Sequence, residues 1–178
     1  VNVVGSSIAN AADDVIYTWA GPEIAVATTK GYSTQLSVLY LFAVWAARLL
    51  KTADGARLDK IFDDILMLPE LTERVILAEP QIKETAKHCG DPKSLFFIGR
   101  NIDYAVSLEA SLKLKEISYI HSEAYAAGEL KHGTISLIEE GRTVIALAAY
   151  EELFDKLLSN IKEVKARGAR VLACATVG

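Results

Sequence analysis

The chain has 178 residues, of which 51% are hydrophobic; this is enough apolar material for one or two compact cores and excludes an intrinsically disordered protein. Nineteen basic and 23 acidic side chains give a net charge of −4, and no basic stripe with interleaved aromatic residues occurs, which excludes a nucleic-acid-binding surface. Cys89 and Cys174 have no metal-like spacing, and we expect free thiols in a reducing, cytoplasmic compartment.

Residues 1–80 are predicted to form a first domain with long helices. Residues 1–4 (VNVV) and 15–19 (VIYTW) have the composition of short strands. Ser33 can cap a helix that ends near residue 51, and residues 38–47 (VLYLFAVWAA) make this helix apolar on nearly every side. The apolar run is shorter than a membrane span, so we expect a buried helix and no membrane association.

A helical pattern continues over residues 58–89, and the two prolines inside it, Pro69 and Pro80, mark kinks or new helix starts. Pro80 lies where we place the domain boundary. The second predicted domain therefore covers residues 81–178.

Strands and helices alternate in this second domain. Continuous apolar runs at 94–98 (SLFFI), 143–149 (TVIALAA) and 171–175 (VLACA) predict strands buried on both faces. Helical patterns cover residues 103–120 and 151–167 between them. Such alternation predicts an α/β fold with a doubly wound parallel sheet.

Neither a cofactor nor a metal ion is expected. The sequence contains no glycine-rich nucleotide motif, and His88, His121 and His132 have no paired ligand spacing. Residues 99–101 (GRN) follow the first predicted strand at the edge where ligands bind in such sheets. A plain turn between strand and helix is the favoured interpretation of that segment.

The richest chemistry lies at residues 113–133, KLKEISYIHSEAYAAGELKHG. On a helix, Glu116 lies three residues after Lys113 and Glu109 four residues before it, so both carboxylates share a face with the lysine. Solvated ion pairs are the plain alternative for these residues. After Tyr119 we expect a polar loop of small residues. Its titratable groups favour the wall of a site, where a carboxylate, a lysine and a histidine could move protons on a small anionic substrate.

This run, together with GPEIAVATTKGYSTQL at residues 21–36, closely resembles the isomerase region of the glutamine:fructose-6-phosphate aminotransferase family, which contains two sugar isomerase (SIS) domains. The two matches occur in the family's order and spacing. The string GELKHG distinguishes this family from other SIS deglycases and isomerases. The resemblance implies a flavodoxin-like SIS fold, with an incomplete first SIS domain in residues 1–80 and a nearly complete second one in residues 81–178.

The resemblance also implies roles for individual residues. Glu116 matches the base that moves a proton between C1 and C2 of the sugar imine, with Lys113 beside it. His132 matches a histidine that assists ring opening and reaches the site from the neighbouring subunit. Val26 matches a backbone contact to the sugar, and Thr28 matches a second sugar-binding position, where the family usually has a serine.

The implied substrate and product are fructose 6-phosphate and glucosamine 6-phosphate, and the implied partners are a second copy in a homodimer and a glutaminase domain of the same parent chain. The family's serine- and threonine-rich phosphate loop and its C-terminal lysine tail are not among these residues, so we expect this stretch alone to have little or no activity. Two alternatives remain: a standalone SIS phosphosugar deglycase or isomerase, and a noncatalytic sugar-phosphate sensing module.

Overall fold

The computed structural model describes residues 1–90 and 92–176. The chain divides into two compact units, Val1–Lys83 and Glu84–Gly178. The boundary between two domains that the sequence predicts near Pro80 stays a prediction.

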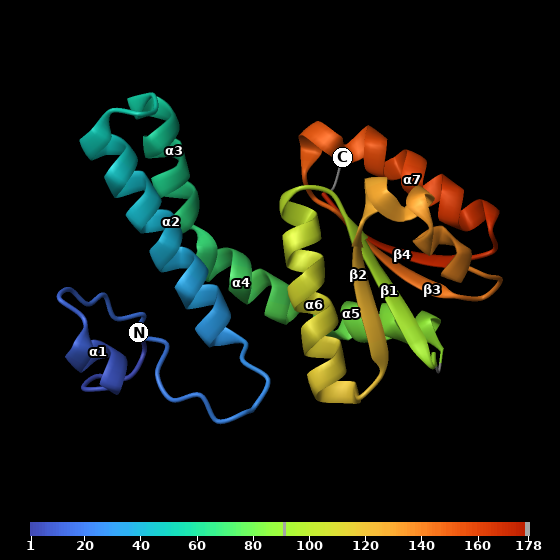
Figure 1. Cartoon of the computed structure of the whole chain (residues 1–178), viewed down its shortest axis with the longest axis horizontal. Coiled ribbons are helices and arrows are strands. Elements are labelled where there is room, and N and C mark those ends of the chain that lie inside the picture. The colour runs from blue at the N-terminus through green and yellow to red at the C-terminus, as the bar shows by residue number, and fades with distance from the viewer. Residues whose placement is uncertain (91, 177–178) are drawn as a thin grey trace. The chain divides into compact units, whose positions relative to one another are not determined.

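The second unit is built on a parallel sheet (Figure 1). Its strands are β1 (Ser94–Gly99), β2 (His121–Ala126), β3 (Thr143–Ala148) and β4 (Arg170–Ala175). They are arranged in the order β2-β1-β3-β4, and each neighbouring pair is parallel. The strand order therefore reverses direction between β1 and β3. The expected α/β fold with a parallel sheet is confirmed.

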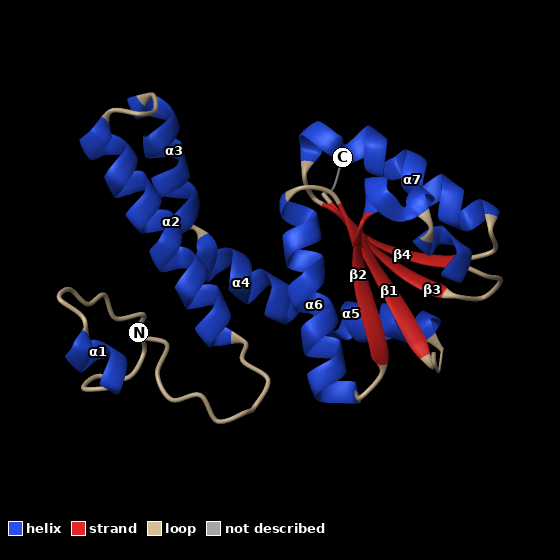
Figure 2. Ribbon diagram, in the orientation of Figure 1, coloured by secondary structure: helices blue, strands red, loops and turns tan. Residues whose placement is uncertain are grey.

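Two long helices connect these strands, α6 (Ile102–Ser118) and α7 (Phe154–Ala166). From β1 the chain crosses through α6 to one edge of the sheet, and from β3 it crosses through α7 to the other edge. Right-handed crossovers in opposite directions place the two helices on opposite faces of the sheet, as Figure 2 shows. The doubly wound arrangement follows from these crossovers.

The core of this unit lies between the sheet and the segments that cover it. Ile98 and Val144 are fully buried in the two central strands, and Leu157 and Val164 cover them from α7. Within the described residues of this unit, the connections also contain four short 3-10 helices: η1 (Lys87–Cys89), η2 (Ala127–His132), η3 (Thr134–Leu137) and η4 (Glu151–Leu153).

Asp103 ties the turn after β1 to the turn after β3. This side chain lies in the first turn of α6 and is 6% exposed. Its Oδ2 accepts hydrogen bonds from the backbone N–H groups of Ala149, at 3.0 Å, and Tyr150, at 2.9 Å. The carboxylate thus closes the carboxyl edge of the sheet at the point where the strand order reverses.

The sequence did not predict β2. We expected a polar, small-residue loop after Tyr119, and this expectation is wrong, because His121–Ala126 forms an edge strand paired with β1. The only buried side chain of β2 is polar: the Ser122 hydroxyl lies 2.9 Å from that of Ser111 on α6. Ser122 also donates to the Ser111 carbonyl at 2.8 Å. A strand that buries a serine under a helix gives no apolar run to detect.

The first unit is helical. It contains α1 (Ser7–Ala11), α2 (Lys30–Leu50), α3 (Gly55–Leu66), α4 (Leu68–Leu77) and the beginning of α5 (Glu79–Ala86). Pro69 lies in the first turn of α4 and Pro80 in the first turn of α5, so of the two predicted possibilities, a kink or a new helix start, the structure has a helix start at each proline.

The two strands predicted near the start of the chain are wrong, since residues 1–83 contain no β-strand. The two segments nevertheless lie side by side: Thr18 N–H donates to the Val1 carbonyl at 2.9 Å, and the Val1 amino group donates to the Ile16 carbonyl at 2.9 Å. Two such contacts do not make a ladder, because each segment has no further strand beside it.

The prediction that α2 is a buried helix is also wrong for this chain. The helix begins at Lys30 rather than at Ser33, and Val44 is its only buried residue. Phe42 is 50% exposed and Trp45 58%, because only α3 packs closely on α2 within this unit. Among the described residues, α2 is the one helix long and apolar enough to cross a membrane by length and composition, a test that core helices also pass.

Candidate active site

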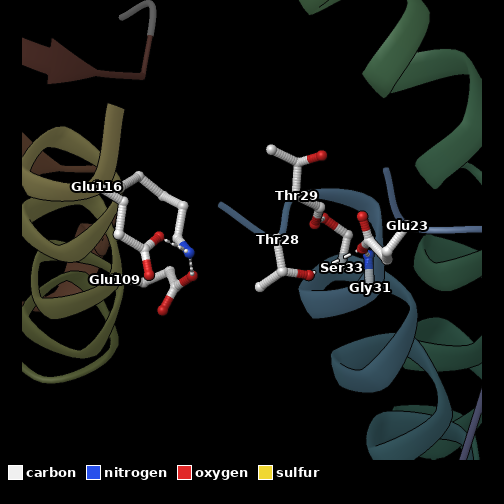
Figure 3. Close-up of polar contacts among 8 residues, drawn as sticks. Glu23, Thr28, Thr29, Gly31, Ser33, Glu109 and Glu116 are labelled. Atoms are coloured by element: carbon white, nitrogen blue, oxygen red, sulfur yellow. Dashed lines mark hydrogen bonds and ion pairs between the residues drawn. The ribbon is translucent and has the colours of Figure 1, made fainter. Parts of the chain in front are cut away.

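Lys113 lies between two carboxylates on one face of α6. Its Nζ is 2.6 Å from Glu116 Oε2 and 3.3 Å from Glu109 Oε1. Figure 3 shows both glutamates on the same side of the helix, with dashed lines joining their carboxylates to the lysine nitrogen. The helical spacing of three and four residues creates this cluster, as the sequence predicted.

The cluster is partly shielded from water. The side chains of Lys113, Glu109 and Glu116 are 18%, 21% and 29% exposed. The hydrogen bond to Glu116 raises the pKa of Lys113 above its ordinary value of 10.5, and the bond to Glu109 acts in the same direction. The stabilisation that accompanies this shift is complete below pH 10.5 and is lost as the pH rises through the raised pKa.

At neutral pH Lys113 is therefore a fixed cation and does not accept a proton. The Glu116 carboxylate lies beside this cation, and an ionised carboxylate can accept a proton from carbon. The pair accordingly offers a base, Glu116, next to a permanent positive charge that stabilises developing negative charge.

His132 is the last residue of η2. Its imidazole lies 3.9 Å from the Glu129 carboxylate, and both side chains are 74% exposed. It is thus available at the surface of the second unit. Among the described residues, no hydrogen bond or ion pair joins His132 to Lys113 or Glu116.

The loop before α2 is organised by one acidic side chain. The Glu23 carboxylate oxygen Oε1 accepts from the Thr28 hydroxyl at 2.8 Å and from Gly31 N–H at 2.7 Å. Figure 3 shows these residues gathered at the N-terminus of α2, where Thr29 provides no side-chain cap. Glu23 therefore does for this helix what the sequence assigned to Ser33.

Val26 lies in the middle of this loop and is 96% exposed. An exposed backbone within a loop whose end is held by Glu23 can present peptide groups to a small polar ligand. Val26 and Thr28 belong to the first unit, whereas Lys113, Glu116 and His132 belong to the second.

Sequence reasoning missed a polar network beside η2, formed by Arg100, Lys131, Asn160 and Glu163. Asn160 is 3% exposed and lies in the otherwise apolar stripe of α7. A buried amide in such a stripe was the available signal, because a buried polar group needs a partner.

No group of three or more histidine, cysteine, aspartate or glutamate side chains is placed to hold a metal ion in the described part of the chain. Cys89 and Cys174 are both free thiols, as predicted. Partial burial raises the pKa of the Cys89 thiol, with Arg170 opposing the shift.

A doubly wound parallel sheet with strand order β2-β1-β3-β4, carrying a lysine–glutamate cluster on its first crossover helix, defines the class of protein. Residues 90–176 match the family model of the SIS domain, and this part of the chain belongs to that family.

Relatives identify the kind of SIS protein to which the chain is similar. It is 54% identical over 177 residues to glutamine--fructose-6-phosphate aminotransferase [isomerizing] of Clostridium acetobutylicum, covering 99% of this chain and 29% of the relative. The enzyme of the same name from Clostridium tetani is 55% identical with the same coverage. The chain is thus homologous to one region of these enzymes and spans less than a third of their length.

A solved structure agrees with this relationship. The C-terminal domain of glucosamine-fructose-6-phosphate aminotransferase from Francisella tularensis superimposes with a TM-score of 0.93 at 36% identity, covering 98% of this chain and 49% of the other. The resemblance inferred from the two sequence runs is confirmed.

Proposed function

We propose that the chain is the isomerase region of an enzyme that converts fructose 6-phosphate and glutamine into glucosamine 6-phosphate and glutamate. The observation that carries this proposal is the Lys113–Glu116 contact on α6, in a chain homologous to aminotransferases of that name over 99% of its length. The reaction needs a base that moves a proton between adjacent carbons of the sugar, and Glu116 is the carboxylate suited to it.

Each remaining residue has one task in this proposal. Lys113 stays protonated and stabilises the negative charge that develops on the sugar during proton transfer. His132, which is exposed on the second unit, assists ring opening in the site of a neighbouring subunit. Val26 and Thr28 contact the sugar from the loop before α2.

The proposed partners follow from the same assignment. A homodimer lets His132 serve the other subunit, and the exposed apolar residues of α2 offer surface for association. A glutaminase domain of the parent chain supplies ammonia, and the enzyme works in the cytoplasm without binding nucleic acid or membrane. No cofactor or metal enters this scheme.

The test is Glu116→Gln in the natural polypeptide that carries this sequence. Glutamine keeps the shape and hydrogen bonding of the side chain but cannot accept the proton. Formation of glucosamine 6-phosphate should fall by about 10²-fold or more, the usual effect of losing a general base. Thermal stability should change little, because partly exposed ion pairs contribute little to it, and fructose 6-phosphate should still bind.

Glu109→Gln is the matched control, since it removes the other carboxylate that contacts Lys113. Its rate should fall by less than Glu116→Gln lowers it. Near-normal product formation by Glu116→Gln would show that this carboxylate is not the base, and Glu123 and Glu129 would be tested next. Binding of fructose 6-phosphate without turnover in the unaltered polypeptide would instead support the noncatalytic sensing module.

A further inference from the structure

The carboxyl end of β1 holds an arginine in a fixed orientation. Arg100 follows β1 directly, and its Nε and Nη2 both donate to Asn160 Oδ1, at 3.1 Å and 2.9 Å. Because both donors share one oxygen, the amide of Asn160 is turned so that its nitrogen points away from the arginine. That nitrogen donates to Glu163 Oε2 at 3.3 Å, one turn further along α7.

Glu163 extends this chain of contacts to η2. Its Oε1 lies 2.7 Å from Lys131 Nζ, and Lys131 immediately precedes His132. The hydrogen bond to Lys131 lowers the pKa of Glu163, and its bond to Asn160 acts in the same direction. Glu163 is therefore ionised at neutral pH and pairs with the lysine as a full charge.

The rest of η2 is held on the side opposite its exposed residues. Ala127 and Leu130 are 0% and 1% exposed within the core. Gly128 lies against the arginine, since a Cβ placed on it would be 3.0 Å from Arg100 Nη2. Core packing and the glycine fix the start of η2, whereas Lys131 fixes its last turn.

We propose that the contacts from Arg100 through Asn160 and Glu163 to Lys131 form a positioning network. This network sets the direction in which the His132 side chain projects from the surface of the second unit. The proposal rests on the proposed function, in which His132 assists ring opening. None of the four residues needs to touch the sugar.

A purely stabilising role for the network predicts different magnitudes. The Lys131 side chain is 59% exposed, and exposed ion pairs contribute little to stability, so the loss of this pair alters stability little. A displacement of a reacting group by about 1 Å, in contrast, can lower a rate by about 10²-fold. Positioning therefore predicts a large change in kcat with a small change in melting temperature.

The test uses Lys131→Met, Glu163→Gln and the double variant in the natural polypeptide. Each single variant should lower kcat by about ten-fold or more. The double variant should have a kcat no lower than that of the less active single variant, because both substitutions remove the same contact. The KM for fructose 6-phosphate should hardly change. Lys131→Arg should restore most of the rate, since the guanidinium can also pair with Glu163. Lys162→Met, an exposed lysine on α7, is the matched control and should behave as the unaltered protein.

Amide hydrogen exchange gives a second readout that does not depend on activity. Exchange over residues 127–132 should become faster in Lys131→Met and Glu163→Gln and stay unchanged in Lys162→Met. Unchanged exchange, or normal kcat in Lys131→Met while Glu116→Gln is inactive, would overturn the positioning role and leave the proposed function intact. If the unaltered polypeptide binds fructose 6-phosphate but forms no glucosamine 6-phosphate, the proposed function fails, and the exchange rates alone decide whether the network orders η2.

Discussion

The two units of the chain use apolar residues in different ways. In the second unit the central strands and α7 bury a continuous core that includes Ile98, Val144, Leu157 and Val164. In the first unit Val44 and Leu58 are the only buried apolar residues. The comparison teaches that a parallel sheet lets one chain cover both of its own faces, whereas a helix that is apolar all round needs more neighbours than the first unit supplies.

The helices of the two units show the same contrast. On α7 the buried positions Leu157, Asn160 and Val164 recur at three and four residues, which is the stripe expected of a helix covering one face of a sheet. On α2 apolar residues surround the helix and remain exposed, among them Leu39, Phe42 and Leu49. A surface of this kind is available for association with another polypeptide surface.

The largest effect is expected from Ile98→Ala in the second unit. Ile98 is fully buried in β1, and removal of such a side chain leaves a cavity that costs about 2–5 kcal/mol. Urea denaturation followed through the two units should show loss of stability in the second unit. Leu108→Ala on α6, 48% exposed, is the matched control and should cost much less. Equal losses in both variants would mean that α6 is covered in solution as thoroughly as β1.

A smaller effect is expected from Asp54→Ala in the first unit. The Asp54 carboxylate caps α3 by accepting from Arg57 N–H at 3.1 Å. Loss of such a cap costs about 0.5–2 kcal/mol, and amide exchange in α3 should become faster while the second unit is unaffected. Asp64→Ala, an exposed aspartate of the same helix, should leave exchange at the helix start unchanged. Altered exchange in β1 would show that the two units do not unfold separately.

The smallest change in stability is expected from Leu49→Gln on α2. Leu49 is 65% exposed, and substitutions at such positions usually change stability by less than about 0.5 kcal/mol. Light scattering on the same variant reports association: if the apolar surface of α2 joins two copies, the polar side chain should shift a dimer toward monomer. A loss of stability as large as that of Ile98→Ala would show that Leu49 is buried in solution.

The alternating half of the chain could be read from its sequence, and the reasons are local. Continuous apolar runs marked β1, β3 and β4, and a glycine, Gly168, follows the C-terminus of α7 with a φ of 86°. The helical spacing of Glu109, Lys113 and Glu116 predicts the contacts between their side chains. These features depend on residues a few positions apart, so the sequence contains them directly.

The missed features depend on contacts between distant parts of the chain. The edge strand β2 is fixed by pairing with β1 and by the Ser111–Ser122 contact, neither of which leaves a periodic apolar signal. The cap of α2 comes from Glu23, well before the helix starts. The link from Arg100 to Asn160 spans 60 positions. Propensity and periodicity do not report such tertiary contacts.

Asp103 gives the second unit a built-in anion. Crevices at the reversal of strand order in open parallel sheets commonly receive negatively charged ligands on backbone N–H groups. Here the N–H groups of Ala149 and Tyr150 already donate to the protein's own carboxylate. An incoming phosphate would have to displace a like charge from its partners before it could bind. These two N–H groups are therefore already occupied by a side chain of the same unit and are not free to bind another anion.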